Sequence, residues 1–121
     1  MKNKVVACIP SKDSAWILKQ TLPHLSKFCY KIIVSDDGSM DNTQEVCSEH
    51  TSVEYYRRSE RDYADRQGGL QRQELLERAY KYDPDYFFFL DADEMPSPDI
   101  IDWINSLGSR HEEQNNLWTF P

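Results

Sequence analysis

The stretch YFFFLDADE at residues 86–94 indicates the fold more strongly than any other part of the sequence. Its first five residues are apolar or aromatic, uncharged and without alternation, which predicts a strand buried on both faces. Asp91, Asp93 and Glu94 follow at once, and they cannot share that burial because unpaired charge in a dry interior is too costly. We therefore expect these carboxylates where the strand leaves the sheet. In open α/β sheets this carboxyl edge binds ligands, and two aspartates one residue apart can supply oxygen ligands to a hard divalent ion.

Strand and helix patterns alternate along the rest of the chain. Apolar runs and periodicity predict strands at residues 5–9, 30–35 and 53–56, helices at 15–25, 41–47, 70–82 and 98–107, and a polar loop at 57–69. Pro10 is expected to close the first strand, Pro23 to kink or end the first helix, and Tyr80 to face inward. This alternation predicts a parallel sheet covered by helices. A further strand pattern begins at residue 117, so we expect the chain to be a piece of a longer protein.

Size and composition limit the possible classes of protein. A chain of 121 residues fits one domain, and its net charge of −7 argues against binding to a nucleic-acid backbone. The three cysteines are odd in number and lack a C-x-x-C pattern, so neither a disulfide framework nor a zinc site is expected. No secretory signal and no membrane span is recognisable. We expect a cytoplasmic protein whose membrane association would depend on regions outside this segment.

Acidic turns follow three of the predicted strands. They lie at residues 10–13, 36–39 and 91–94. Since the strands of a parallel sheet end at one edge, turns that are far apart in sequence become neighbours in space. So much negative charge would repel itself unless a positive or hydrogen-bonding group lay there. A metal with a nucleotide diphosphate would satisfy it, because carboxylates accept hydrogen bonds from ribose and base N–H groups while the metal screens the phosphates.

Each of these features also has a simpler interpretation. Asp-Gly-Ser after a strand is often only a turn with a helix cap, and Asp13 could cap the first helix. An Asp-x-Asp pair arises readily by chance in an acidic chain. Arg66 and Arg72 could merely solvate a helix face. The glycines Gly68 and Gly69 between them nevertheless allow close backbone approach, and an arginine can reach a phosphate.

Four motifs, in order and with suitable spacing, resemble those of glycosyltransferase family 2, whose members have the GT-A fold. VVACIPSKD at residues 5–13 is similar to the family's opening strand and P-x-Y-N turn, and IIVSDDGSMDNT at residues 32–43 is similar to its V-D-D-G-S-x-D-x-T motif. GLQR at residues 69–72, with the later Ala79, resembles the G-x-x-x-A-R-N-x-G motif. FLDADE at residues 89–94 resembles the family's D-x-D motif. Lys12, Asp13, Gln71 and Gln73 depart from these patterns. The resemblance covers about residues 5–107.

The resemblance implies a three-layer α/β/α, Rossmann-like, mostly parallel sheet and a nucleotide-diphosphate sugar as donor, often UDP-linked. Asp37 would hydrogen-bond the base. Asp91 would contact ribose or water around the metal, and Asp93, with Asp91 beside it, would coordinate Mn²⁺ or Mg²⁺ across the diphosphate. Arg72 and Arg66 would approach the donor. The nucleotide-sugar-binding residues that the resemblance implies are Pro10, Ser11, Asp13, Asp36, Asp37, Gly38, Arg66, Arg72, Asp91 and Ala92.

The implied reaction is inverting transfer of the sugar to a hydroxyl of a saccharide, a lipid-linked compound or another acceptor. Departure of the diphosphate develops negative charge, which a divalent metal stabilises as a Lewis acid, and a carboxylate base deprotonates the acceptor. In the family that base lies well beyond the D-x-D motif. We therefore expect it beyond residue 121, with Glu94 as a local candidate. Residues 1–121 are then a single GT-A-like nucleotide-sugar-binding domain without the acceptor-binding half.

Three other functions stay open at this point. A nucleotidyltransferase would carry a glycine-rich, basic loop after its first strand, where this chain has PSKD at residues 10–13. A magnesium-binding signalling domain would place its paired acids after the first strand, whereas here they follow the second. A non-catalytic domain could bind a nucleotide sugar and transfer nothing.

Overall fold

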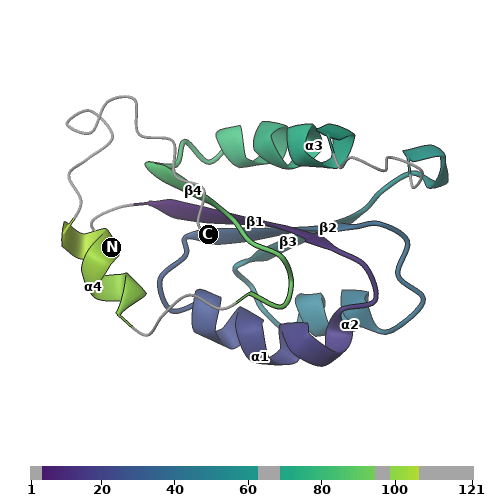
Figure 1. Cartoon of the computed structure of the whole chain (residues 1–121), viewed down its shortest axis with the longest axis horizontal. Helices are drawn as coiled ribbons and strands as arrows, with labels where there is room; N and C mark the ends of the chain where they lie inside the picture. Colours follow the sequence, from purple (N-terminus) through teal and green to yellow (C-terminus); the bar gives the residue numbers. More distant parts are fainter. Residues whose placement is uncertain (1–3, 63–68, 95–98, 107–121) are drawn as a thin grey trace.

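In the described part of the chain, four parallel strands form the central sheet (Figure 1). The computed structural model describes residues 4–62, 69–94 and 99–106. The strands are β1 (Val5–Ser11), β2 (Lys31–Asp36), β3 (Val53–Arg57) and β4 (Tyr86–Phe89), and their spatial order is β3-β2-β1-β4. Every pairing is parallel, so all four strands end at the same side of the sheet. We call this side the carboxyl edge.

Helices cover both faces of the sheet. α1 (Ala15–Leu25) and α2 (Thr43–Ser48) lie on one face, and α3 (Gly69–Tyr80) lies on the other (Figure 1). A short 3-10 turn, η1 (Glu60–Asp62), follows β3, and α4 (Ile100–Ser106) follows β4. The predicted three-layer, Rossmann-like α/β fold is thereby confirmed. Within the described ranges, no helix has the length and apolar character needed to cross a membrane.

Alternation of side chains along the strands produces an apolar core on each face of the sheet. On the α1 face, Leu18, Leu22 and Phe28 are buried with Phe88 of β4. The rings of Phe28 and Phe88 lie 6.0 Å apart between centroids. The core on the α3 face is smaller and consists of Val6, Cys8, Ile33, Leu75 and Ala79. The two cores fix the sheet between its helices and so fix the position of the carboxyl edge.

β1 continues through Pro10 to Ser11, although the proline was expected to close the strand. The carbonyls of Val5 and Ser11 accept N–H groups from residues adjoining β2, at 2.8 and 2.9 Å, whereas the carbonyl of Cys8 accepts the N–H of Leu90 after β4, at 3.1 Å. Odd-numbered residues of β1 therefore bond toward β2 and even-numbered residues toward β4. The missing N–H of Pro10 would point toward β4 and make the next rung after the bond from Leu90 to Cys8, so pairing with β4 stops here while pairing with β2 continues to Ser11.

α1 also continues past its proline. Pro23 is exposed in the last turn, and the helix runs on to Leu25. A proline removes one backbone donor, so the loss is confined to one hydrogen bond near the helix end. Leu22 and Leu25 are both buried in the core, and their packing stabilises this last turn.

β4 is less buried than its apolar sequence suggests. Tyr86 and Phe88 are buried, but Phe87 and Phe89 on the α3 face are only partly covered. Tyr80 at the end of α3 is 66% exposed and meets Phe87 edge-on, with ring centroids 5.4 Å apart. The expectations of a strand buried on both faces and of an inward Tyr80 are thus wrong for the described residues. In that part of the chain, β4 pairs with β1 alone, and α3 covers this end of the face incompletely.

Glu54 joins β3 to the end of α3. Its carboxylate accepts hydrogen bonds from Lys81 Nζ at 2.8 Å, from Arg78 Nη1 at 3.3 Å and from the hydroxyl of Tyr82. Burial by itself would raise the pKa of Glu54, but the hydrogen bonds from Lys81, Tyr82 and Arg78 outweigh it and hold the pKa below its ordinary value of 4.5.

We expect Glu54→Gln to lower the free energy of unfolding at pH 7 by about 1 kcal/mol, because two of the three partners are half-exposed. Stability from a depressed carboxyl pKa is present above the unfolded value and is lost as the pH falls through the folded value. The difference between parent and variant should therefore shrink below about pH 4.5. Urea unfolding from pH 7 to pH 3 measures it, with exposed Glu45→Gln as control. A constant difference across this range would contradict the assignment.

Candidate functional site

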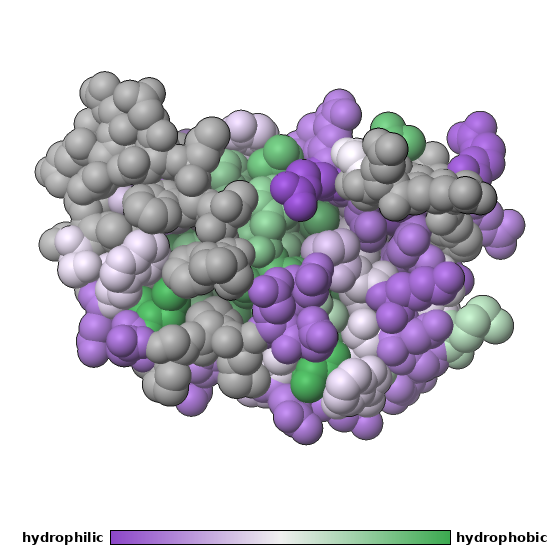
Figure 2. Space-filling model, in the orientation of Figure 1, coloured by the Kyte–Doolittle hydropathy of each residue, from purple (hydrophilic) through white to green (hydrophobic). Residues whose placement is uncertain are grey.

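The turns after β1, β2 and β4 lie along the carboxyl edge of one sheet. β1 is flanked by β2 and β4, and neighbouring strands lie about 4.8 Å apart. β4 ends opposite Cys8, so its turn is set back from the other two by about three residues of β1. Figure 2 shows a mostly hydrophilic surface on the right of the view, where the loops after β1 and β2 lie in Figure 1. The topology therefore brings together the acidic turns that the sequence separates.

The turns after β1 and β2 are joined by direct hydrogen bonds. The N–H of Asp37 donates to the carbonyl of Ser11 at 2.9 Å, and the N–H of Asp13 donates to Ser39 Oγ at 2.8 Å. In return, Asp13 Oδ1 accepts the N–H of Met40 at 2.6 Å. One oxygen of the Asp13 carboxylate, expected to contact the nucleotide, is therefore used here to connect the two turns.

Asp36 is enclosed and supports the turn that follows it. Its Oδ1 accepts the N–H of Ser39 at 2.8 Å, and its Oδ2 accepts the hydroxyl of Tyr55, with Arg57 Nη1 at 3.8 Å. Burial and the Asp36 carboxylate raise the pKa of Tyr55, so its hydroxyl stays a donor. Gly38 adopts φ 92°, which a residue with a Cβ rarely does. Asp36 was expected to contact the nucleotide, but its full burial makes it a support for the turn instead.

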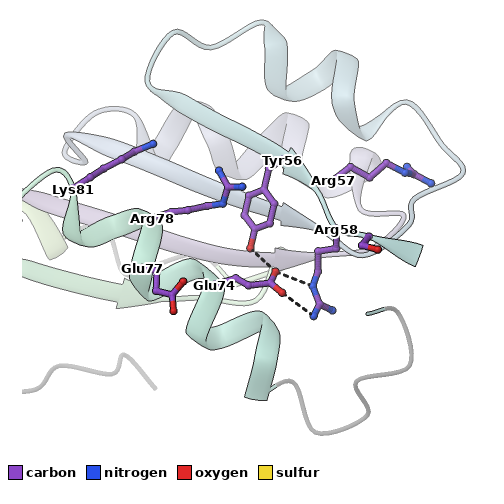
Figure 3. Close-up of a pocket in the computed structure, with 8 residues that line it drawn as sticks. Tyr56, Arg57, Arg58, Glu74, Glu77, Arg78 and Lys81 are labelled. Atoms are coloured by element: carbon purple, nitrogen blue, oxygen red, sulfur yellow. Dashed lines mark hydrogen bonds and ion pairs between the residues drawn. The ribbon is translucent and has the colours of Figure 1, made fainter. Parts of the chain in front are cut away.

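Asp37, the next residue, points its carboxylate to a buried arginine. Arg58 Nη1 donates to Asp37 Oδ1 at 2.8 Å. Arg58 Nε donates to Glu74 Oε1 of α3 at 3.1 Å (Figure 3). The Arg58 side chain is 1% exposed and that of Asp37 is 23% exposed. Burial lowers the pKa of Arg58, but hydrogen bonds to Glu74 and Asp37 outweigh it and raise the pKa, so the guanidinium stays charged. The carboxylate of Asp37 is thus held by a permanent cation and remains partly open to solvent.

The turn after β4 is closed by two hydrogen bonds between Asp91 and Glu94. Asp91 N–H donates to Glu94 Oε1 at 2.7 Å, and Glu94 N–H donates to the carbonyl of Asp91 at 3.0 Å. Ala92 is buried, and its carbonyl accepts the hydroxyl of Thr21 on α1 at 3.4 Å. Asp91 and Asp93, on either side of it, are exposed. Glu94, the local candidate for a base, therefore caps the turn that presents these two aspartates.

Arg72 lies beside the end of β4. Its guanidinium stands over the ring of Phe89, 5.2 Å from the centroid, and Phe89 precedes Asp91 by two residues. The neighbouring Gln71 is buried and donates to both the carbonyl and the hydroxyl of Ser35, at 3.1 Å each. This link fixes the first turn of α3 against the end of β2. Arg66, the other predicted arginine, lies outside the described residues.

The carboxylates in the turn after β4 suit a divalent ion that a substrate also coordinates. Within the described residues, no group of three or more His, Cys, Asp or Glu side chains is arranged to hold a metal. Asp91 and Asp93 nevertheless offer carboxylate oxygens on an exposed turn. Mg²⁺ is commonly held by one or two carboxylates together with water and the phosphates of a substrate. These two residues therefore suit an ion that a diphosphate completes.

Sequence reasoning missed three residues that shape this edge: Tyr55, Arg58 and Glu74. Their partners are far apart in the chain, so no local motif marks them. The alternation of β3 is the one available signal. It places Tyr55 and Arg57 on the face of Asp36, and Tyr56 and Arg58 on the face of α3.

The chain matches one protein family and is similar to solved structures. The family model described as glycosyl transferase family 2 matches residues 6–113. No curated protein sequence matches the chain. A crystal structure of residues 1–349 of TarS from S. aureus is similar, with a TM-score of 0.70 and 17% identity over 85% of this chain. A second TarS structure from S. aureus has a TM-score of 0.67 and 18% identity over 84% of this chain. The chain spans 31% and 19% of these two structures, and at such identities the likeness shows the fold.

We expect Tyr55→Phe to destabilise the protein, because the buried Asp36 carboxylate then loses one donor. The free energy of unfolding should fall by roughly 1–3 kcal/mol, the scale of a hydrogen bond to a charged group. Urea unfolding measures the change. Tyr80→Phe is the matched control, since that hydroxyl belongs to an exposed side chain, and its effect should be close to zero. Equal effects of the two substitutions would show that Tyr55 does not support the turn.

Proposed function

Because the chain belongs to glycosyl transferase family 2, we propose that it binds a nucleotide-diphosphate sugar at the carboxyl edge, for transfer of the sugar to an acceptor hydroxyl. UDP is the proposed nucleotide, Mn²⁺ or Mg²⁺ the proposed ion, and inversion the proposed outcome. The acceptor is a saccharide, a lipid-linked compound or another hydroxyl compound. Support comes from the family match, which covers most of the chain, and from the acidic turns that share one edge.

The turns after β1 and β2 are proposed to bind the nucleoside. Asp37 Oδ1 is occupied by Arg58, whereas Oδ2 makes no hydrogen bond with the described residues and can accept a base N–H. The hydroxyl of Ser11 is buried and likewise has no partner in the described part of the chain. A buried hydroxyl without a partner is uncommon in proteins, and a ligand atom would satisfy it. Pro10 and Gly38 would contact the bound nucleoside through their backbone.

The turn after β4 is proposed to bind the diphosphate. Asp93 would coordinate the divalent ion, with Asp91 beside it, and the guanidinium of Arg72 would attract the phosphates. When bound, the ion would act as a Lewis acid toward the charge that develops on the leaving diphosphate. The buried Ala92 holds the two aspartates in place during this step.

One observation carries the proposal: the free carboxylate of Asp93. Among the described residues, Asp13, Asp36 and Asp37 have donors for their carboxylates at this edge. The side chain of Asp93 has no hydrogen bond or ion pair with any described residue. Its negative charge therefore stays uncompensated at the anchored turn, where a cation would neutralise it.

The base that deprotonates the acceptor is proposed to lie beyond residue 121. The Glu94 carboxylate already accepts the N–H of Asp91 and closes the turn. We propose that residues 1–121 form the nucleotide-sugar-binding portion of the enzyme, and that a further portion supplies the base and binds the acceptor.

We expect UDP to bind the full chain in a manner that depends on Mn²⁺. Asp93→Ala should reduce the affinity measured with Mn²⁺ to that measured without it, since the substitution removes an ion ligand. Asp37→Asn should weaken UDP binding by roughly 1–3 kcal/mol, the scale of one charge-assisted hydrogen bond. Isothermal titration calorimetry with UDP, with and without Mn²⁺, measures both effects.

Glu49→Gln is the control, because that carboxylate is exposed at the end of α2. It should leave the affinity for UDP unchanged. The proposal fails if the parent is indifferent to uridine nucleotides, or if Asp93→Ala binds Mn²⁺ and UDP as tightly as the parent. Release of UDP from a nucleotide sugar in the presence of acceptors then separates an active transferase from a domain that only binds the donor.

A further inference from the structure

A buried cation links the two ends of the proposed donor site. Arg58 follows β3, and its backbone N–H donates to the carbonyl of Asp36 at 2.8 Å, which places it directly beside the turn that carries Asp37. Its side chain then crosses to α3. Nε and Nη2 donate to Glu74 at 3.1 and 3.4 Å (Figure 3). Nη1 donates to Asp37 at 2.8 Å. Among the described residues, one guanidinium thus contacts carboxylates from two different parts of the fold.

We propose that Arg58 is a positioning residue for the nucleotide: it orients the Asp37 carboxylate and couples it through Glu74 to α3, the helix that carries Arg72. This inference rests on the proposed function, because Asp37 and Arg72 are assigned there to the donor. Arg58 itself does not contact the ligand. It acts through the two residues whose relative position it sets.

The contact between Arg58 and Asp37 leaves Oδ2 of Asp37 as a hydrogen-bond acceptor with a defined position. Because Oδ1 is held by Arg58, rotation of the carboxylate is restricted, and Oδ2 stays at a fixed place on the partly open side. A carboxylate fixed in this way accepts the N–H of a base without first losing rotational freedom. Without Arg58 the carboxylate would turn freely, and nucleotide binding would have to order it.

The contact with Glu74 fixes the helix. Glu74 also accepts the hydroxyl of Tyr56 at 3.1 Å, so its carboxylate is held from both β3 and the segment after it. Arg72 lies two residues earlier on α3, and the link from Gln71 to Ser35 holds the same turn of the helix to β2. The position of Arg72 relative to Asp37 thus depends on two anchors, of which the Arg58 bridge is the charged one.

The bridge from Arg58 to Asp37 and Glu74 sets the positions of these groups more than it stabilises the fold. Removing an arginine and two carboxylates from water costs much of what their attraction gains, so a buried ion pair is a weak source of stability. A cleft of about 480 Å³, which Arg58 and Glu74 help to line, contains a further arginine with which Arg58 can be compared. Arg78 of α3 also lines this cleft. It stands 3.7 Å from the centroid of the Tyr56 ring and pairs with Glu54, and among the described residues it makes no hydrogen bond or ion pair with Asp37 or Glu74. Arg78 therefore serves as the matched control.

The test measures UDP affinity in the presence of Mn²⁺ for the full-chain variants Arg58→Met, Arg58→Lys, Glu74→Gln and Arg78→Met, with urea unfolding alongside. We expect Arg58→Met to weaken binding at least ten-fold and Glu74→Gln several-fold, although neither residue contacts the ligand. Arg58→Lys keeps the charge but cannot span both carboxylates, so its affinity should lie between those of the parent and Arg58→Met. Arg78→Met should bind as the parent does.

A double-mutant cycle with Asp37→Asn separates positioning from general stabilisation. If Arg58 acts through Asp37, the effects of Arg58→Met and Asp37→Asn on affinity are not additive, and the second substitution costs little once the first is present. Should Arg58→Met fail to fold, the cycle of Glu74→Gln with Asp37→Asn gives the same answer.

The outcomes distinguish this inference from the function on which it rests. A parent protein that binds no uridine nucleotide overturns both. A parent that binds UDP, with additive cycles or with affinities unchanged in Arg58→Met and Glu74→Gln, overturns the inference alone. Lower unfolding free energy together with unchanged affinity would make Arg58 a stabilising residue only.

Discussion

The two-sided hydrogen bonding of β1 is the constraint on which the whole site depends. Odd-numbered carbonyls of β1 accept N–H groups from the β2 side, and the carbonyl of Cys8 accepts from the β4 side. A parallel strand paired on both sides must end between the ends of its neighbours. The turn after β1 therefore lies between the turn that carries Asp37 and the turn that carries Asp93. The last of the β2-side bonds, from Asp37 N–H to the Ser11 carbonyl, joins two of these turns directly.

Hydrogen-bond and ion-pair partners within the protein determine which carboxylates at the carboxyl edge stay available to a ligand. Asp13, Asp36 and Glu94 accept backbone N–H groups and so hold turns in shape, at the cost of being less available to a ligand. Asp37 is neutralised by a buried arginine and keeps one oxygen free. Asp91 and Asp93 remain exposed. One set of acidic residues thus builds the loops, and a smaller set is available to the proposed donor and its ion.

Local patterns in the sequence predicted the fold because strands, helices and acidic turns each have a local signal. The periodicity of α1 and the apolar run at β4 identified their elements, and Asp-Gly-Ser identified the turn after β2. The errors have a different origin. The extension of β1 through Pro10 depends on its pairing with β2, and the exposure of Tyr80 depends on how far α3 covers β4. The bridge from Arg58 to Asp37 and Glu74 joins residues 21 and 16 positions apart, and no motif of adjacent residues reveals it.

The central claim is that turns distant in sequence form one site for a nucleotide and its ion. Paramagnetic broadening of backbone amide signals by Mn²⁺, with UDP bound to the isotope-labelled full chain, tests this most directly. We expect loss of signal at residues 11–13, 36–39 and 91–94 together, while amides at the opposite edge of the sheet, such as those of Asp85 and Val53, stay sharp. Broadening centred on the opposite edge, or on only one of the three turns with UDP bound, would contradict the account.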